Sequence, residues 1–215
     1  MISRPEDINH PIVFGTTLTI GEYIMPDLLI KLVSDYPSIN ITMIVGNTKS
    51  LLEKLRDGNI DFALLEGHFD KSKYNSLLFS LESFIGVCSA NHPLADSKLS
   101  FKDIFNERLI LREEGSGTRE IFEQILYEHN TTMKNFNQFI EIGNISVIKE
   151  MVSNNLGITF LYKEAVKDEL ASGILKKINI KDLDVEREFN FVFLKDTLHY
   201  KEYEDWFHYL MENRI

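Results

Sequence analysis

Short apolar runs alternate along the chain with longer stretches in which apolar residues recur at helical spacing. This alternation, with a short turn between neighbouring segments, is typical of parallel α/β sheets. The pattern predicts strands at 12–14, 39–45, 62–65, 84–89, 109–111, 139–142, 158–162, 174–180 and 189–194. It predicts helices at 24–36, from Asn47 or Thr48 to Gly58, and at 117–130, 145–155, 163–171 and 200–212.

The predicted elements form two consecutive β/α series. The tripeptide Asn91-His92-Pro93 breaks the pattern between them and marks the exit from the first series. We therefore expect two lobes with a cleft between them. The chain would cross from one lobe to the other near Cys88 and return near Phe189.

Composition excludes several classes of protein. The 215 residues carry 23 Lys and Arg against 33 Asp and Glu, a net charge of −10 with no basic cluster, so the chain by itself is not expected to bind nucleic acid. Residues 1–11 are polar and no apolar run approaches a membrane span, so neither secretion nor membrane insertion is expected. The single cysteine, Cys88, excludes an internal disulfide and indicates a cytoplasmic location.

Four turns share one layout, in which an apolar strand ends, small polar residues follow and a helix begins. The carboxyl ends of parallel strands and the N-termini of the following helices face the ligand crevice of such sheets, so these turns together predict a site for a small anion. Helix capping alone is the simpler explanation for any single turn. The candidates are Thr16, Thr17 and Thr19, Asn47 and Thr48, Ser116 and Thr118, and Gly143 and Asn144.

Glu66 ends the third predicted strand at the same edge. Its carboxylate is a candidate receptor for a ligand ammonium group, and a solvated or capping carboxylate is an equally good explanation.

Signatures of enzymes and metal sites are missing. Glu113 takes the place of the first glycine of a nucleophile elbow, no phosphate-binding loop is present, and residues 115–120 lack the last glycine of a dinucleotide motif. The six histidines have no metal-ligand spacing, and the apolar setting of Cys88 indicates a core residue. Trp206 lies in a helical pattern that favours packing. We expect no catalytic residue, no metal and no cofactor.

Six segments, in this order and spacing, resemble the effector-binding domain of LysR-type transcriptional regulators. They are residues 15–26, 36–37, 57–63, 92–95, 113–119 and 156–158. The resemblance implies two Rossmann-like α/β subdomains joined by two crossover strands, as in type II periplasmic binding proteins. Subdomain I would comprise residues 12–87 and 190–215, and subdomain II residues 88–189.

The resemblance also implies a function and partners. A small-molecule effector would lie in the cleft and contact the positions matching Thr17, Thr19, Asn47-Thr48, Glu66 and Gly143-Asn144. The protein would be a cytoplasmic bacterial regulator that pairs as a homodimer through helices 26–36 and 145–155, and for the full-length form a tetramer is the alternative to a dimer.

The chain departs from the family pattern in three places. Glu66 replaces a common Thr or Ser and Ile20 a common Gln, and both departures disfavour a purely inorganic anion. The expected effector is a small anionic or zwitterionic metabolite, and Glu66 fits one that carries an amino group as well as a carboxylate. Residues 1–11 leave no room for the winged helix-turn-helix of the family, so the chain is expected to be a regulatory fragment that reaches DNA only through that absent domain.

Two other functions suit the same fold. A solute-binding protein would need a signal peptide or a lipid anchor. An enzyme would need a general acid and a general base, for which Glu66 is the only candidate.

Overall fold

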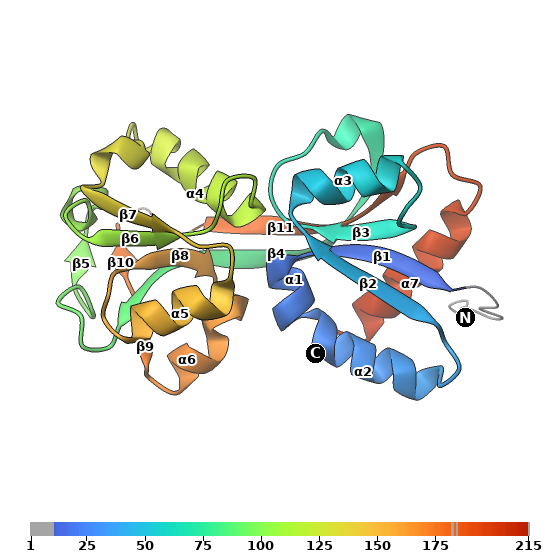
Figure 1. The fold of residues 1–215 in the computed structure, drawn as a ribbon, viewed down its shortest axis with the longest axis horizontal. Helices are drawn as coiled ribbons and strands as arrows, with labels where there is room; N and C mark the ends of the chain where they lie inside the picture. The colour runs from blue at the N-terminus through green and yellow to red at the C-terminus, as the bar shows by residue number, and fades with distance from the viewer. Residues whose placement is uncertain (1–10, 182, 184, 215) are drawn as a thin grey trace. The chain divides into compact units, whose positions relative to one another are not determined.

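The computed structural model describes residues 11–181, 183 and 185–214, and these residues divide into two compact units. Unit 1 contains the described residues up to 81 and from 188 onward, and unit 2 contains those from 82 to 187 (Figure 1). The boundaries expected from the sequence lie after residues 87 and 189.

Unit 1 is built on a mostly parallel sheet. Strand β1 (Ile12–Thr17) lies between β2 (Ile41–Gly46) and β3 (Phe62–Leu65) and runs parallel to both. Strand β11 (Val185–Leu194) pairs antiparallel with β3. The register pairs Thr17 with Gly46, so β1 and β2 end at the same edge of the sheet.

Helices cover both faces of this sheet. Helix α3 (Thr48–Arg56) buries Leu51 and Leu55 against Ala63, Leu65 and Val192. On the other face Phe62 stacks between Phe14 and Phe191, with ring centroids 5.2 and 4.5 Å away. Phe62 also meets Tyr203 of helix α7 (Tyr200–Glu212) edge to face, and Trp206 of the same helix is buried, as its helical spacing predicted.

The remaining elements of unit 1 are short. They are helix α1 (Leu18–Tyr23), helix α2 (Met25–Asp35) and the 3₁₀ turn η1 (Lys71–Lys73). Pro26 lies in the first turn of α2, where its missing N–H leaves no helical hydrogen bond unmade.

Unit 2 has its own parallel strands. Strand β6 (Arg108–Leu111) pairs parallel with β7 (Gln138–Glu141), and the N–H of Ile110 donates to the carbonyl of Ile158 at the start of β8 (Thr159–Tyr162). Strand β4 (Tyr74–Ser89) pairs antiparallel with β8 and with β9 (Leu175–Lys177). A separate parallel pair joins β5 (Lys98–Leu99) to β10 (Asn179–Ile180).

The helices of unit 2 are α4 (Gly117–Glu128), α5 (Ile145–Ser153) and α6 (Lys167–Ala171), with the 3₁₀ turns η2 (Phe101–Ile104), η3 (Met133–Asn135) and η4 (Lys163–Val166). Phe122 of α4 stacks on Phe160 of β8 with ring centroids 4.3 Å apart. Gly157 allows β8 to approach β6, because a Cβ there would lie 2.4 Å from the carbonyl oxygen of Arg108.

Strands β4 and β11 each pass from one unit into the other (Figure 1). Strand β4 is much longer than the predicted strand 84–89. The prediction missed its first half, which is only partly buried and lacks a long apolar run. The single predicted strand 174–180 is wrong as well. It divides at Ile178 into β9 and β10, which pair with different strands.

Candidate ligand-binding site

Three candidates of unit 1 follow strands that end at one edge of its sheet. Thr17 is the last residue of β1, Asn47 follows β2 and Glu66 follows β3. Thr17 is 2% exposed, and its hydroxyl has no hydrogen-bond partner among the residues that the structure describes. Thr17 also makes no side-chain cap to helix α1, so capping does not account for this hydroxyl.

Thr48 and Glu66 are joined directly. The Thr48 hydroxyl donates a 2.6 Å hydrogen bond to the main-chain carbonyl of Glu66, and both residues are buried. This bond fixes the start of α3 against the end of β3. The Thr48 hydroxyl therefore has a structural role within unit 1.

Asn47 and Asn144 are helix caps. Asn47 Oδ1 accepts from the N–H of Ser50 at 2.8 Å, and Asn144 Oδ1 accepts from the N–H of Val147 at 3.0 Å. Each bond satisfies a donor in the first turn of a helix that has no partner inside that helix. Capping thus explains both asparagines without a ligand, and only their amide nitrogens are left for other contacts.

Thr16 and Thr19 lie beneath the surface of unit 1. A Cβ at Gly21 would lie 2.6 Å from Thr16 Oγ1, so this hydroxyl faces the backbone of helix α1. Thr19 is buried within α1 itself. The turn after β1 therefore offers Thr17 as its strongest candidate for contact with a ligand.

Unit 2 places Ser116 at the N-terminus of α4. Ser116 is 2% exposed, makes no side-chain cap, and its hydroxyl has no hydrogen-bond partner in the described part of the chain. Its N–H donates to the carbonyl of Glu113 at 3.2 Å, which closes a tight turn in which Gly115 has a φ of 84°. Thr118 is buried in the first turn of the same helix.

Arg112 also belongs to this turn, although it was not among the candidates predicted from the sequence. It is 5% exposed, and its Nε and Nη2 donate to the two carboxylate oxygens of Glu113 at 2.7 and 2.8 Å. The third nitrogen, Nη1, is buried and has no partner among the described residues. The only sequence feature that could have identified Arg112 as a candidate is its position directly after the predicted strand 109–111.

Two of the predicted turns meet in unit 2. A Cβ at Gly143 would lie 3.6 Å from Glu113 Oε2, so the turn before α5 lies against the turn before α4. Arg119 of α4 reinforces this arrangement, since its Nη1 bonds to Glu141 at the end of β7 and to the carbonyl of Arg112. The site residues of unit 2 thus gather at the carboxyl ends of β6 and β7.

Metal and thiol chemistry find no support at these turns. In the described part of the chain, no three His, Cys, Asp or Glu side chains are grouped closely enough to hold a metal ion. Burial raises the pKa of the Cys88 thiol to about 11, with the charges of Asp96 and Glu107 adding to the effect. Cys88 is fully buried, as the apolar run around it predicted.

Comparisons with known proteins agree on one family. The family model described as the LysR substrate binding domain matches residues 6–214. CysL of Bacillus subtilis is 30% identical over 179 residues, covering 83% of this chain and 59% of the relative. CmpR of Synechocystis is also 30% identical, covering 83% and 58%. The chain therefore spans less than two thirds of the length of these transcriptional regulators.

Solved structures show the same fold at low sequence identity. The regulatory domain of CcmR from Synechocystis, in complex with 2-PG, superposes with a TM-score of 0.83 at 20% identity and covers 94% of this chain and 96% of that one. The effector-binding domain of QuiR, in complex with shikimate, gives 0.78 at 19% identity with the same coverage. These likenesses confirm the expected type II periplasmic-binding-protein fold.

Proposed function

Because the chain belongs to the LysR substrate-binding domain family, we propose that it is the effector-sensing domain of a LysR-type transcriptional regulator. It binds a small anionic or zwitterionic metabolite and thereby alters DNA binding by the longer regulator. In this proposal a winged helix-turn-helix domain of the longer regulator contacts DNA.

One observation carries this proposal: at the strand ends of both units lie buried hydroxyl groups that have no hydrogen-bond partner among the described residues. Thr17 supplies one in unit 1 and Ser116 one in unit 2. A buried hydroxyl that makes no hydrogen bond costs free energy, so such groups usually have a partner. A bound ligand would supply such a partner.

Two features support the proposed class of ligand. The related domains of CcmR and QuiR are solved in complex with 2-PG and with shikimate. Glu66 is buried beside Thr48 in this chain, and a carboxylate at that place suits a ligand with an ammonium group. An amino acid suits Glu66 through its ammonium group, and a small anionic metabolite is the other member of the proposed class.

The domain senses the ligand because ligand binding is coupled to a conformational equilibrium. A ligand shifts the balance between two conformations of the domain only by its difference in affinity for them.

The domain acts in the bacterial cytoplasm, where such regulators meet DNA, and we assign it no catalytic role. None of the helices in the described ranges is long and apolar enough to cross a membrane.

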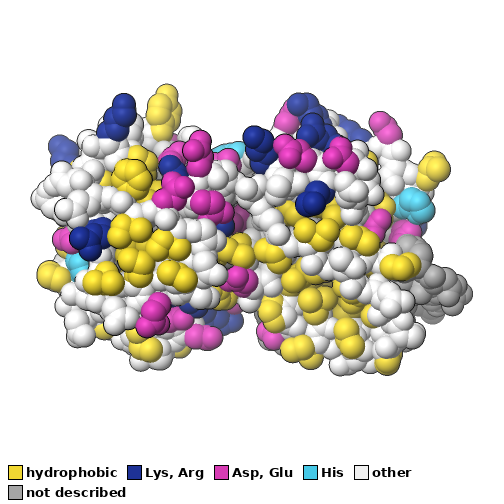
Figure 2. All heavy atoms as spheres, viewed as in Figure 1, with side chains coloured by type: hydrophobic (Ala, Val, Ile, Leu, Met, Phe, Trp, Pro, Cys, Tyr) yellow, Lys and Arg dark blue, Asp and Glu magenta, His cyan; other side chains and the backbone are white. Residues whose placement is uncertain are grey.

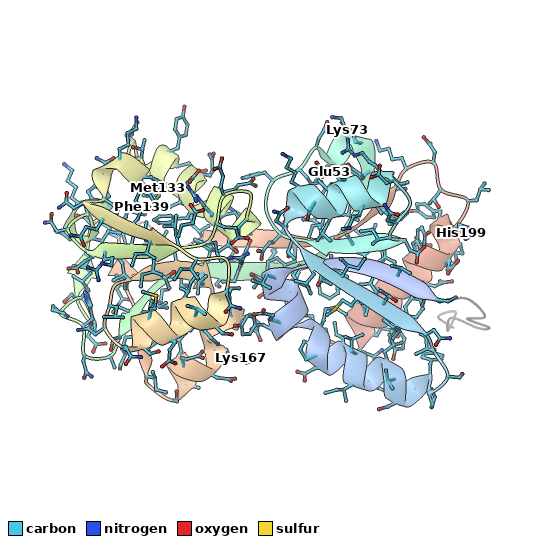
Figure 3. All side chains as sticks on the ribbon, in the orientation of Figure 1. Glu53, Lys73, Met133, Phe139, Lys167 and His199 are labelled. Carbon is cyan, nitrogen blue, oxygen red and sulfur yellow. The ribbon has the colours of Figure 1, made fainter. Side chains whose placement is uncertain are left out.

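Exposed apolar faces support a homodimer. Ile30 and Val33 of α2 are 68% and 51% exposed, and Val45 on the edge strand β2 is also exposed. In unit 2, Val147 of α5 and Phe139 of the edge strand β7 are exposed, and Figure 3 labels Phe139. Figure 2 shows hydrophobic side chains gathered over these elements in each unit. We propose that α2 of one protomer packs against α5 of its partner.

A thermal-shift screen tests effector binding. The purified chain is mixed with sulfate, phosphate, small carboxylates and amino acids, because a ligand that binds only the folded state raises the unfolding temperature. We expect a selective shift with a carboxylate or an amino acid, and we expect Thr17→Val to abolish it. A simple dianion that acts as strongly as every carboxylate would contradict the proposed ligand class.

Thr159→Val is the matched control. Thr159 also has a buried hydroxyl without a partner in the described part of the chain, but it lies at the start of β8, away from the strand ends that carry the candidates. We expect this variant to respond to ligand like the unmodified chain. An equal loss of response in both variants would mean that the substitutions act on folding.

A further inference from the structure

Two buried donors in one turn of unit 2 are not used by the described protein groups. They are Nη1 of Arg112 and the hydroxyl of Ser116, which belong to the connection between β6 and α4. Both residues are more than nine-tenths buried. Buried donors in native proteins nearly always have a partner, so two of them within five residues indicate a group that binds here.

The guanidinium of Arg112 is already oriented. Glu113 holds its Nε–Nη2 edge with two hydrogen bonds of 2.7 and 2.8 Å. The carbonyl of Arg112 is itself bonded by Arg119, which anchors the backbone of this residue to α4. The two bonds to Glu113 fix the plane of the guanidinium and so the direction of Nη1, which bonds to none of the described residues. A planar acceptor is the group that an oriented guanidinium recognises best.

We infer that Arg112 binds the acidic group of the effector, with Ser116 as the second donor, and that this group is a single carboxylate. The inference deepens the proposed function and rests on it. The structure gives two reasons for the carboxylate, one from geometry and one from charge.

The geometric reason is the pairing of donors. A carboxylate has two acceptor oxygens in one plane, which one guanidinium N–H and one hydroxyl can share. The N-terminus of α4 adds the positive end of a helix of twelve residues. Neutral ligand groups would not use this partial charge.

The electrostatic reason is Glu113. Its carboxylate already neutralises the Arg112 guanidinium, so the pair carries no net charge. A singly charged group is enough to offset the half-charge of the helix end, so the second charge of a phosphate dianion would stay uncompensated beside Glu113. Glu113 thus sets the selectivity of the site by limiting the charge that it accepts.

Three simple probes separate these effects. Acetate carries one carboxylate, acetamide has the same shape without the charge, and inorganic phosphate supplies the dianion. Binding is followed by the midpoint of thermal unfolding and by the NMR signal of the arginine Nε–H groups, at constant ionic strength. The NMR signal reports contact at one arginine, which a general stabilisation of the fold does not produce.

Four variants complete the design. Ser116→Ala removes a hydroxyl that bonds to none of the described residues, so it leaves folding intact and tests the site directly. Arg112→Lys keeps the charge but loses the planar fork, and Glu113→Gln keeps an acceptor for Arg112 without the negative charge. Arg108→Lys is the matched control, because Arg108 is the first residue of β6, the strand that Arg112 follows, and is exposed and bonds to Gln138 at 3.2 Å.

We expect acetate to raise the unfolding midpoint more than acetamide and to shift the signal of Arg112 but not that of Arg108. Ser116→Ala should weaken acetate binding about threefold to tenfold, as expected for the loss of one hydrogen bond. Arg112→Lys should weaken it further, and Glu113→Gln should strengthen phosphate binding roughly tenfold.

The inference is overturned if acetate and acetamide act alike, or if acetate acts equally on the unmodified chain, Ser116→Ala and Arg112→Lys. Its failure is distinct from that of the proposed function. A metabolite whose effect is lost in Thr17→Val but unchanged in Ser116→Ala and Arg112→Lys supports effector sensing and refutes this assignment. Acetate contact at Arg112 without any response to the metabolite panel supports the assignment and counts against the proposed ligand class.

Discussion

The hydroxyl of Thr48 donates a 2.6 Å hydrogen bond to the main-chain carbonyl of Glu66. Eighteen residues separate the two in sequence, and both are buried. The bond ties the first residue of α3 to the residue that follows β3. The Thr48 side chain thus fixes the turn after β2 against the turn after β3.

Loss of this bond should destabilise the fold. Thr48→Val keeps the side-chain shape and leaves the buried Glu66 carbonyl without its donor, so we expect a loss of about 1–3 kcal/mol in the free energy of unfolding. Urea unfolding followed by circular dichroism measures it. Thr42→Val, at an exposed position of β2, is the control and should change little. Equal midpoints for the two variants would show that the bond contributes nothing.

The cap at Asn144 gives a second test. Asn144→Ala removes the acceptor for the N–H of Val147, and we expect a cost of about 1 kcal/mol. Asn144→Asp keeps an acceptor and should retain the stability. Chemical denaturation of the three proteins measures the difference. If Asn144→Asp lost as much stability as Asn144→Ala, the cap would not be the source of the effect.

The buried thiol of Cys88 should be unreactive. Burial raises its pKa to about 11, so the thiolate that reacts with alkylating reagents is scarce at neutral pH. We expect iodoacetamide to label the native protein very slowly at pH 8 and the urea-unfolded protein rapidly. Mass spectrometry at timed intervals measures both rates. Fast labelling under native conditions would contradict the burial of this residue.

Tyr209 should make stability fall at high pH. Burial and the hydrogen bond that its hydroxyl donates to Asp35 at 2.8 Å raise the pKa of Tyr209 above its ordinary value. Because the folded-state pKa is the higher one, this contribution is fully present below a pH of about 10 and is lost as pH rises beyond it. Tyr209→Phe removes the titration. Between pH 8 and 11 the unfolding midpoint of the unmodified protein should therefore fall more steeply than that of Tyr209→Phe. Parallel curves for the two proteins would show that Tyr209 does not cause the loss of stability.

The exposed face of α2 predicts the effect of a charge on assembly. Ile30→Glu puts a carboxylate in the middle of the proposed dimer face, so we expect it to shift the protein to monomers. Analytical ultracentrifugation measures the mass of both forms. Leu198→Glu is the control, since Leu198 is fully exposed in a loop away from α2 and should leave the mass unchanged. An Ile30→Glu protein that remained a dimer would place the interface elsewhere.

The order of strands and helices was predictable because each carries its own periodicity. Strand β3 and helix α7 have the bounds that the pattern predicted, since the one is a continuous apolar run and the other an amphipathic helix. Helix α1 was not predicted, because six residues are too few to show a helical period. The first half of β4 was missed because most of its residues are only partly buried, so it lacks the long apolar run of the second half.

The sequence by itself determined the fold class, the family and the turns that carry small polar residues, because local patterns and motifs are written in consecutive residues. Tertiary structure decided how those residues are used. Asn47 and Asn144 cap helices, Thr16 faces α1, and Arg112 has a buried nitrogen without a partner in the described part of the chain. Burial and hydrogen-bond satisfaction depend on neighbours from distant parts of the chain, which no local pattern reveals.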